Sequence, residues 1–190
     1  PIDPVMAEDG KIYERNAILE WFSTKPPPIT SPSTNARMGK RLLPAIQTKN
    51  TISTLIKSGA IEGEIAEAWQ KKLEQEKRMK ATRAKAEGGD GEAMWQLGAW
   101  YSQGTTGLVK DSAQARAWYE RSAATRDPMG LSCFGSSLLR GAGGPQNTSL
   151  GLVYITDGAH LGSNLGAFRL GEAFFKGNGL PKDPVQARFW

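Results

Sequence analysis

Side chains able to do covalent or metal chemistry are scarce in this 190-residue chain, which has one cysteine, Cys133, and one histidine, His160. A structural zinc site uses about four Cys or His ligands, so the sequence predicts no metal site. A nucleophilic thiol needs an activating environment. We expect Cys133 to be a small core residue and His160 to lie on a helix surface or in a groove. The sequence therefore predicts no catalytic residue and no cofactor, and any function should act through binding.

Composition narrows the class of protein further. Hydrophobic residues make up 39% and charged residues 23% of the chain, which is typical of a globular protein. The longest apolar stretch, around residues 150–155, is far shorter than the roughly 20 residues of a membrane span. A single cysteine suits a reducing compartment, so we expect a cytoplasmic or nuclear protein. The chain opens on Pro1 and closes on Trp190 in mid-pattern, and we expect it to be part of a longer protein.

The net charge of +5 is mild, and the basic side chains are densest over residues 71–85. A basic patch there could bind nucleic acid or an anionic membrane, with an affinity that falls steeply with salt. Acidic residues are interleaved along the same segment, which favours a solvated helix face. We therefore predict no nucleic-acid partner and no membrane partner.

Strand and helix signals alternate over residues 1–60. Two short apolar runs, 4–7 and 12–13, flank Asp9-Gly10, a pair that tolerates the positive φ of a hairpin turn. The signals that follow predict a helix, a proline-rich loop, a strand and a helix, over residues 14–22, 26–33, 42–43 and 48–58. The buried stripe of the last helix is expected to consist of Ile52, Leu55 and Ile56.

Residues 61–87 have a different composition, with charges at thirteen of the 26 positions from 62 to 87. A narrow apolar seam at a spacing of four runs through Ile61, Ile65, Trp69 and Leu73. The pattern predicts one helix of about 39 Å at 1.5 Å per residue. It would serve as a spacer, or as the pairing surface of a homodimer.

From about residue 88 the chain repeats itself. Leu97-Gly98, Phe134-Gly135 and Leu170-Gly171 mark equivalent points, 37 and 36 residues apart. A period in the mid-thirties indicates helical hairpins stacked into an all-α solenoid. The middle copy departs from the pattern, because Gly151 stands where the first copy has Ala115.

The repeated pattern resembles the Sel-one-like repeat of the tetratricopeptide class. That repeat begins with a helix of the pattern A-x-x-x-L-G-x-x-Y-x-x-G, followed by a loop, an Asp and a second helix that contains A-x-x-W-Y. The first copy matches this whole pattern between Ala93 and Tyr119. The resemblance covers residues 88–190, about two and a half repeats, the third ending inside its second helix. Members of this family are binding scaffolds, so the resemblance implies that this part holds a protein substrate or adaptor.

Residues 1–59 resemble the U-box, the metal-free relative of the RING domain. The matching elements occur in the family's order: Asp3-Pro4-Val5, Asp9-Gly10, Tyr13-Glu14-Arg15, Ile18 with Trp21-Phe22, Ser31-Pro32 with Thr34-Asn35, and Leu43-Pro44 leading to Lys49-Asn50 and Ile52. In U-boxes hydrogen bonds and salt bridges replace zinc. The resemblance implies that role for Asp3, Asp9, Glu14 and Arg15, with Pro4, Gly10 and Tyr13 as further structural residues.

The U-box resemblance also implies a partner, a ubiquitin-conjugating enzyme charged with ubiquitin. Trp21, Pro32 and Asn35 stand at the positions that contact this enzyme, and Asn35 replaces an Arg that many members carry. Asparagine is shorter and uncharged, so a weaker activation of the bound ubiquitin is expected.

Taken together, the patterns predict a small α+β U-box domain over residues 1–60, a helical linker over 61–87 and a helical-repeat solenoid over 88–190. The implied function is that of a ubiquitin-protein ligase of the non-covalent, RING-like type. It would hold a charged conjugating enzyme beside a substrate bound to the repeats, which raises their effective concentration. The alternative is a non-catalytic scaffold, in which the U-box fold serves only as an interaction module.

Overall fold

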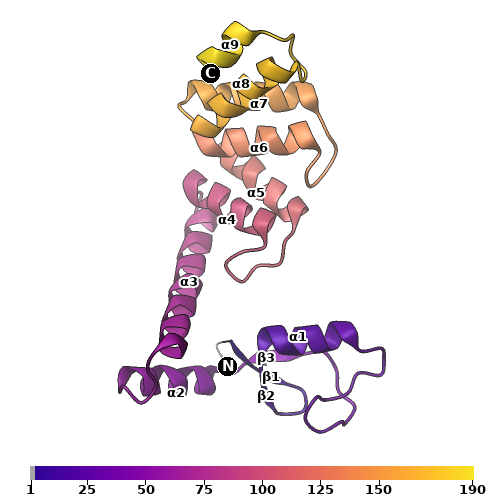
Figure 1. Ribbon diagram of the computed structural model, residues 1–190, viewed down its shortest axis with the longest axis vertical. Helices are drawn as coiled ribbons and strands as arrows, with labels where there is room; N and C mark the ends of the chain where they lie inside the picture. The colour runs from indigo at the N-terminus through magenta and orange to yellow at the C-terminus, as the bar shows by residue number, and fades with distance from the viewer. Residues whose placement is uncertain (1–2) are drawn as a thin grey trace. The chain divides into compact units, whose positions relative to one another are not determined.

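The computed structural model describes residues 3–190, which form two compact units that divide between Glu74 and Gln75. The division lies within α3 (Glu64–Glu87), the charged helix predicted over residues 62–87. Over the described range the secondary structure is mostly helical, with one small sheet near the N-terminus (Figure 1).

The N-terminal unit is built on a three-stranded antiparallel sheet in the order β2-β1-β3. The predicted hairpin is present: β1 (Pro4–Ala7) pairs with β2 (Ile12–Glu14), with Val5 opposite Tyr13. Gly10 in the turn has φ of +75°, a conformation that costs glycine little. β3 (Leu42–Pro44) pairs with the other edge of β1.

The core of this unit lies between the sheet and α1 (Arg15–Thr24). Ile18 and Phe22 are four residues apart and therefore share one face of α1. They are buried with Val5 of β1 and with Ile29, which lies in the loop after the helix. This packing places the loop from residue 29 onward next to α1.

The predicted buried stripe of the next helix, α2 (Ile46–Lys57), was wrong. Leu55 is 39% exposed, Ile52 and Ile56 are only half-buried, and no residue of α2 is fully buried. Contact with α3 is instead made by the Trp69 indole N–H, which donates to Ser53 Oγ at 3.2 Å.

The seam predicted along α3 is discontinuous. Trp69 is buried, whereas Ile65 is 66% exposed. The reason is geometric: each step of four residues turns about 40° around a helix of 3.6 residues per turn, so three steps sweep about 120°. Pairing of this helix with a second copy stays a prediction.

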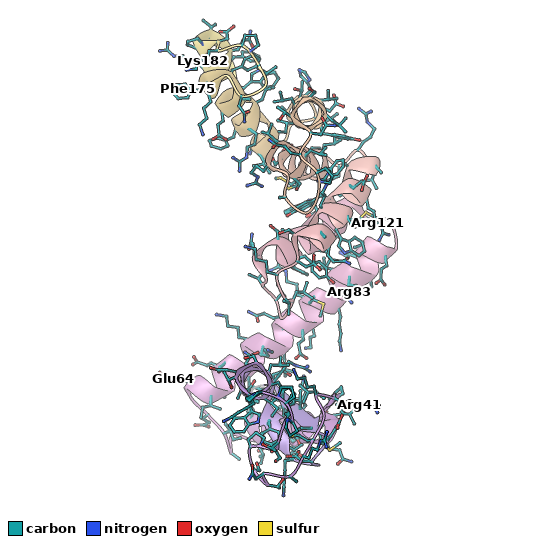
Figure 2. All side chains as sticks on the ribbon, turned by 90° about the vertical axis from the view of Figure 1, so that its right-hand side faces the viewer. Arg41, Glu64, Arg83, Arg121, Phe175 and Lys182 are labelled. Atoms are coloured by element: carbon teal, nitrogen blue, oxygen red, sulfur yellow. The ribbon has the colours of Figure 1, made fainter. Side chains whose placement is uncertain are left out.

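Three helical hairpins stack in the C-terminal unit (Figure 1). Their paired helices are α4 (Gly91–Gln103) with α5 (Ser112–Ala124), α6 (Pro128–Arg140) with α7 (Thr148–His160), and α8 (Asn164–Lys176) with α9 (Pro184–Phe189). The C-terminal end of α3 caps the first hairpin: Ala86 is buried against α4, and the Arg83 guanidinium donates to the Tyr101 hydroxyl at 3.1 Å (Figure 2).

The helix starts recur at the same period as the apolar pattern. Every helix from α4 to α9 begins after a residue whose side chain accepts a hydrogen bond from a backbone N–H of the first turn. These caps are Asp90, Asp127 and Ser163 for the first helices of the hairpins, and Asp111, Asn147 and Asp183 for the second. Such caps satisfy otherwise unpaired N–H groups and set the helix boundaries locally.

Small residues bring the two helices of each hairpin close together. A Cβ on Gly98 would lie 2.7 Å from the Tyr119 ring, and one on Gly171 would lie 3.1 Å from a backbone oxygen of α9. The middle hairpin is tightest, because a Cβ on Gly135 would lie 2.6 Å from the Gly151 carbonyl oxygen. At Gly151, where the sequence departs from the repeat pattern, the backbones of α6 and α7 therefore lie closer together than those of the other two hairpins.

Candidate functional site

In the N-terminal unit, the carboxylate of Asp3 joins three helices. Arg15 Nε of α1 donates to it at 2.9 Å, while the ammonium groups of Lys49 on α2 and Lys72 on α3 lie 3.6 and 3.5 Å away. Burial alone would raise the pKa of Asp3, but these positive charges, led by Arg15, hold it below the usual value of 3.8. The Glu14 carboxylate accepts the Asp3 backbone N–H, with both oxygens at 3.1 Å.

A second network ties the hairpin turn to the following loop. The Tyr13 hydroxyl donates to Asp9 Oδ2 at 2.6 Å, and the buried Ser31 hydroxyl donates to the same oxygen. Ser31 Oγ in turn accepts the backbone N–H groups of Ser33 and Thr34. Desolvation would raise the pKa of Asp9, but the hydrogen bonds from Ser31 and Tyr13 outweigh it and lower the pKa.

Of the structural residues suggested by the sequence, Asp3, Glu14 and Arg15 meet in the first network, and Asp9 and Tyr13 meet in the second. Ser31 and Lys49 belong to the elements that resemble a U-box, but the sequence assigned them no part in a network, and Lys72 was not singled out. Their partners are distant in sequence. Glu8 was also missed: its carboxylate accepts the backbone N–H groups of Gly39 and Arg41, at 2.8 and 3.2 Å. Its place beside the turn at Asp9-Gly10 was the only available signal.

The three residues expected to contact a conjugating enzyme lie on α1 and on the adjacent loop. The half-buried Trp21 donates its indole N–H to the Thr30 carbonyl oxygen at 2.8 Å, and Lys25 Nζ lies 4.4 Å from its ring centre. Pro32 and Asn35 are exposed on the loop held by this contact. Asn35 has φ of +58°, a left-handed conformation that asparagine tolerates better than most residues.

In the C-terminal unit, the first helices of the three hairpins line a groove. Its larger hollow, of about 250 Å³, is bounded by residues of α4, α5, α6 and α8, including Trp95, Cys133 and Leu165. A smaller hollow of about 140 Å³ shares three of the lining residues, namely Ser136, Arg140 and Arg169. We call this surface the repeat groove.

Charged side chains gather at one end of the repeat groove. The Arg169 guanidinium donates to Glu172 at 2.9 Å, and Lys176 Nζ donates to the same carboxylate at 2.6 Å. The hydrogen bond from Lys176, followed by that from Arg169, lowers the pKa of Glu172. Arg140 adds a further positive charge from the end of α6.

The single cysteine, on α6, and the single histidine, on α7, lie in different surroundings. Burial raises the pKa of Cys133 to about 11, which keeps the thiol protonated near neutral pH. His160 is exposed on α7 and its ring packs edge-on against Trp190. Within residues 3–190, no three Cys, His, Asp or Glu side chains are arranged to hold a metal ion, and no helix is both long and apolar enough to span a bilayer.

Comparison with solved structures identifies the fold of the repeats. The Sel1 repeat protein from Oxalobacter formigenes is 30% identical, with a TM-score of 0.52, over 58% of this chain and 84% of that protein. A protective antigen of uropathogenic Escherichia coli, c5321, shares the fold at 24% identity and a TM-score of 0.52. The match covers 76% of this chain and 29% of that antigen, so the chain spans less than a third of its length. No curated protein matches the chain.

The family comparison falls on the repeats that the sequence pattern marks most clearly. The Sel1 repeat model matches residues 91–124 and 165–190, which are the first and third hairpins. The intervening hairpin, α6 with α7, has the same architecture although its sequence departs from the pattern. The comparisons support Sel1 repeats and a protein-interaction fold, whereas the U-box resemblance stays a prediction. This chain belongs to the Sel1 repeat family.

Proposed function

We propose that this chain is a non-catalytic protein-interaction scaffold that holds an extended segment of a partner protein in the repeat groove. The observation that supports it most directly is the groove itself, which side chains from all three hairpins line. Trp95 offers an aromatic surface there, a residue type enriched at binding hot spots. The helices behind the groove are held by buried packing, so the surface is preorganised for binding.

The test is to fill the groove without disturbing the fold. Ala99 lines the larger hollow from α4, and Ala99→Trp places a bulky ring in it. Ala117→Trp is the matched control, because Ala117 is exposed on α5 and does not line the groove. Peptides selected from a random twelve-residue library on the parent protein are then titrated against all three proteins.

If the groove is the binding site, we expect the selected peptides to bind the parent and Ala117→Trp with equal affinity. They should bind Ala99→Trp at least about ten-fold more weakly, which corresponds to about 1.4 kcal/mol of binding free energy. Circular dichroism spectra of the three proteins should coincide. Equal binding by Ala99→Trp, or the failure of the library to yield any binder, would count against the groove as a binding site.

We also propose a second function, that of a U-box-type ubiquitin-protein ligase. In support, networks of hydrogen bonds and ion pairs centred on Asp3 and Asp9 tie together the hairpin, loop and helices of the N-terminal unit, beside its apolar core. Trp21 and Pro32 are partly or fully exposed on adjacent segments, as a shallow interface for a conjugating enzyme would require. No covalent step on this chain is involved, since the thioester belongs to the conjugating enzyme.

Autoubiquitination with activating enzyme, ubiquitin and a panel of conjugating enzymes tests the ligase. Activity in the parent that is lost in both Trp21→Ala and Pro32→Ala would support it and assign the binding surface. Pro32→Ala changes an exposed residue, so its loss of activity would not reflect a disrupted core. Silence across the panel from folded protein would leave the scaffold as the function.

A further inference from the structure

Ser136 is an unusual residue in the wall of the repeat groove. It lies on α6, its side chain is 4% exposed, and it lines both hollows. Its hydroxyl has no hydrogen-bond partner among residues 3–190. A buried polar group without a partner costs about 1–3 kcal/mol, so such groups in folded proteins call for an explanation.

Arg169, which lines the same hollows, has a second buried donor. Its Nε atom also lacks a partner within the described chain, although its Nη1 donates to Glu172. Arg140, one turn beyond Ser136 on α6, lines the same two hollows and donates through Nε to the Ser136 carbonyl oxygen at 3.2 Å. Two guanidinium groups and a hydroxyl from two different helices therefore border one space.

The charge balance of this end of the groove favours an anion. Arg140, Arg169 and Lys176 bring three positive charges to the smaller hollow, and Glu172 brings one negative charge. The Glu172 carboxylate is already paired with Arg169 and Lys176. The remaining excess of positive charge favours an anion, and the two oxygens of a carboxylate match the two donors without partners, the Ser136 hydroxyl and Arg169 Nε–H. A carboxylate, with a single negative charge, is also repelled less by Glu172 than a phosphate would be.

We propose that Ser136, Arg140 and Arg169 form a carboxylate-recognition site that reads an acidic residue, or the terminal carboxylate, of a peptide bound in the repeat groove. The carboxylate would accept hydrogen bonds from the Ser136 hydroxyl and from Arg169 Nε, with the Arg140 guanidinium neutralising its charge. Guanidinium groups match carboxylates in geometry and form stronger, charge-assisted hydrogen bonds. This inference rests on the proposed scaffold function and names the chemistry of the partner segment.

The experiment uses three pools of synthetic hexapeptides with the same mixture of Ala, Leu and Ser at the remaining positions. One pool has a single internal Glu and an amidated C-terminus, the second has Gln and a free C-terminus, and the third has Gln and an amidated C-terminus. Affinity is measured by calorimetric titration, and the Nε–H signals of arginine are followed by NMR. The first two pools separate a side-chain carboxylate from a terminal one.

The variants are chosen so that a loss of binding is not a loss of fold. Ser136→Ala removes a hydroxyl without a partner, so the fold should tolerate it well. Arg169→Ala removes the second donor. The matched control is Arg121→Ala, because Arg121 (labelled in Figure 2) is exposed on α5. It is not among the residues that line either hollow.

We expect at least one carboxylate pool to bind roughly 10- to 100-fold more tightly than the neutral pool, the usual range for charge-assisted hydrogen bonds. The preference should vanish in Ser136→Ala and Arg169→Ala, persist in Arg121→Ala, and be accompanied by a shift of the Arg169 Nε–H signal. Equal binding of all three pools would overturn the carboxylate site and leave the groove as a binding surface. If none of the three pools binds, while library peptides still bind the parent and bind Ala99→Trp more weakly, the carboxylate site is wrong and the scaffold proposal stands. If the library also yields no binder, both the carboxylate site and the scaffold proposal are overturned.

Discussion

Replacing Gly151 by alanine makes the middle repeat look more like the first, yet we expect it to destabilise the protein. In a helix interior, alanine is favoured over glycine by about 1 kcal/mol, so the local effect alone would be stabilising. The new Cβ, however, would lie 2.8 Å from the Gly135 oxygen and 2.9 Å from the Leu139 nitrogen. Both are backbone atoms of α6, so relief of the contact requires the two helices to separate.

Overpacking of this kind costs about 1–3 kcal/mol, and rigid backbone neighbours place Gly151→Ala at the upper end. After subtraction of the local gain, we expect a net loss of about 2 kcal/mol, which lowers the melting temperature by roughly 4–8 °C.

The assay is thermal unfolding followed by circular dichroism, with hydrogen exchange to locate the change in α6 and α7. Ala115→Gly in the first repeat is the reciprocal control, and it should also destabilise, by about 1 kcal/mol, because that helix pair already accommodates a methyl group. A rise in melting temperature for Gly151→Ala would refute the argument, since it would mean that the repeat pattern, rather than the backbone approach, decides which residue fits.

The N-terminal unit and the thiol provide further tests. The pKa of Asp3 in the folded protein lies below the usual value of 3.8, so its carboxylate contributes fully to stability above pH 3.8. This contribution is lost as the pH falls further and the folded carboxylate is protonated. In unfolding curves measured across this pH range, Asp3→Asn should therefore lose less stability on acidification than the parent. Tyr13→Phe should destabilise the hairpin and loop by about 1–3 kcal/mol, because it removes the hydrogen bond to Asp9, and amide hydrogen exchange in this region should become faster. Adding a chelator such as EDTA to the parent protein should leave hydrogen exchange in the same region unchanged. Cys133 should alkylate far more slowly at pH 7.5 than an unperturbed thiol, with a rate that rises toward pH 11; rapid labelling would contradict its burial. Asn35→Arg should lower stability by about 1–2 kcal/mol in urea unfolding, because it places a side chain less suited to positive φ at this position.

Much of the fold was predictable because its signals are local. The hairpin at Gly10 follows from a turn residue between two short apolar runs, and the helical hairpins follow from a pattern that recurs every 36 or 37 residues. The incomplete burial of Ile52, Leu55 and Ile56 was not predictable, because an apolar face in the sequence does not reveal how far other elements cover it.

By itself, the sequence predicted helical repeats over residues 88–190 and showed that a single Cys and a single His are available for thiol or metal chemistry, since the period and the residue inventory can be read along the chain. Only the tertiary structure decided which charges meet at Asp3, because Lys49 and Lys72 reach it from helices far along the chain. The same is true of the repeat groove. Ser136 and Arg169 stand on different helices in unremarkable sequence contexts, and only the stacking of the hairpins makes them neighbours with unpaired donors bordering one hollow.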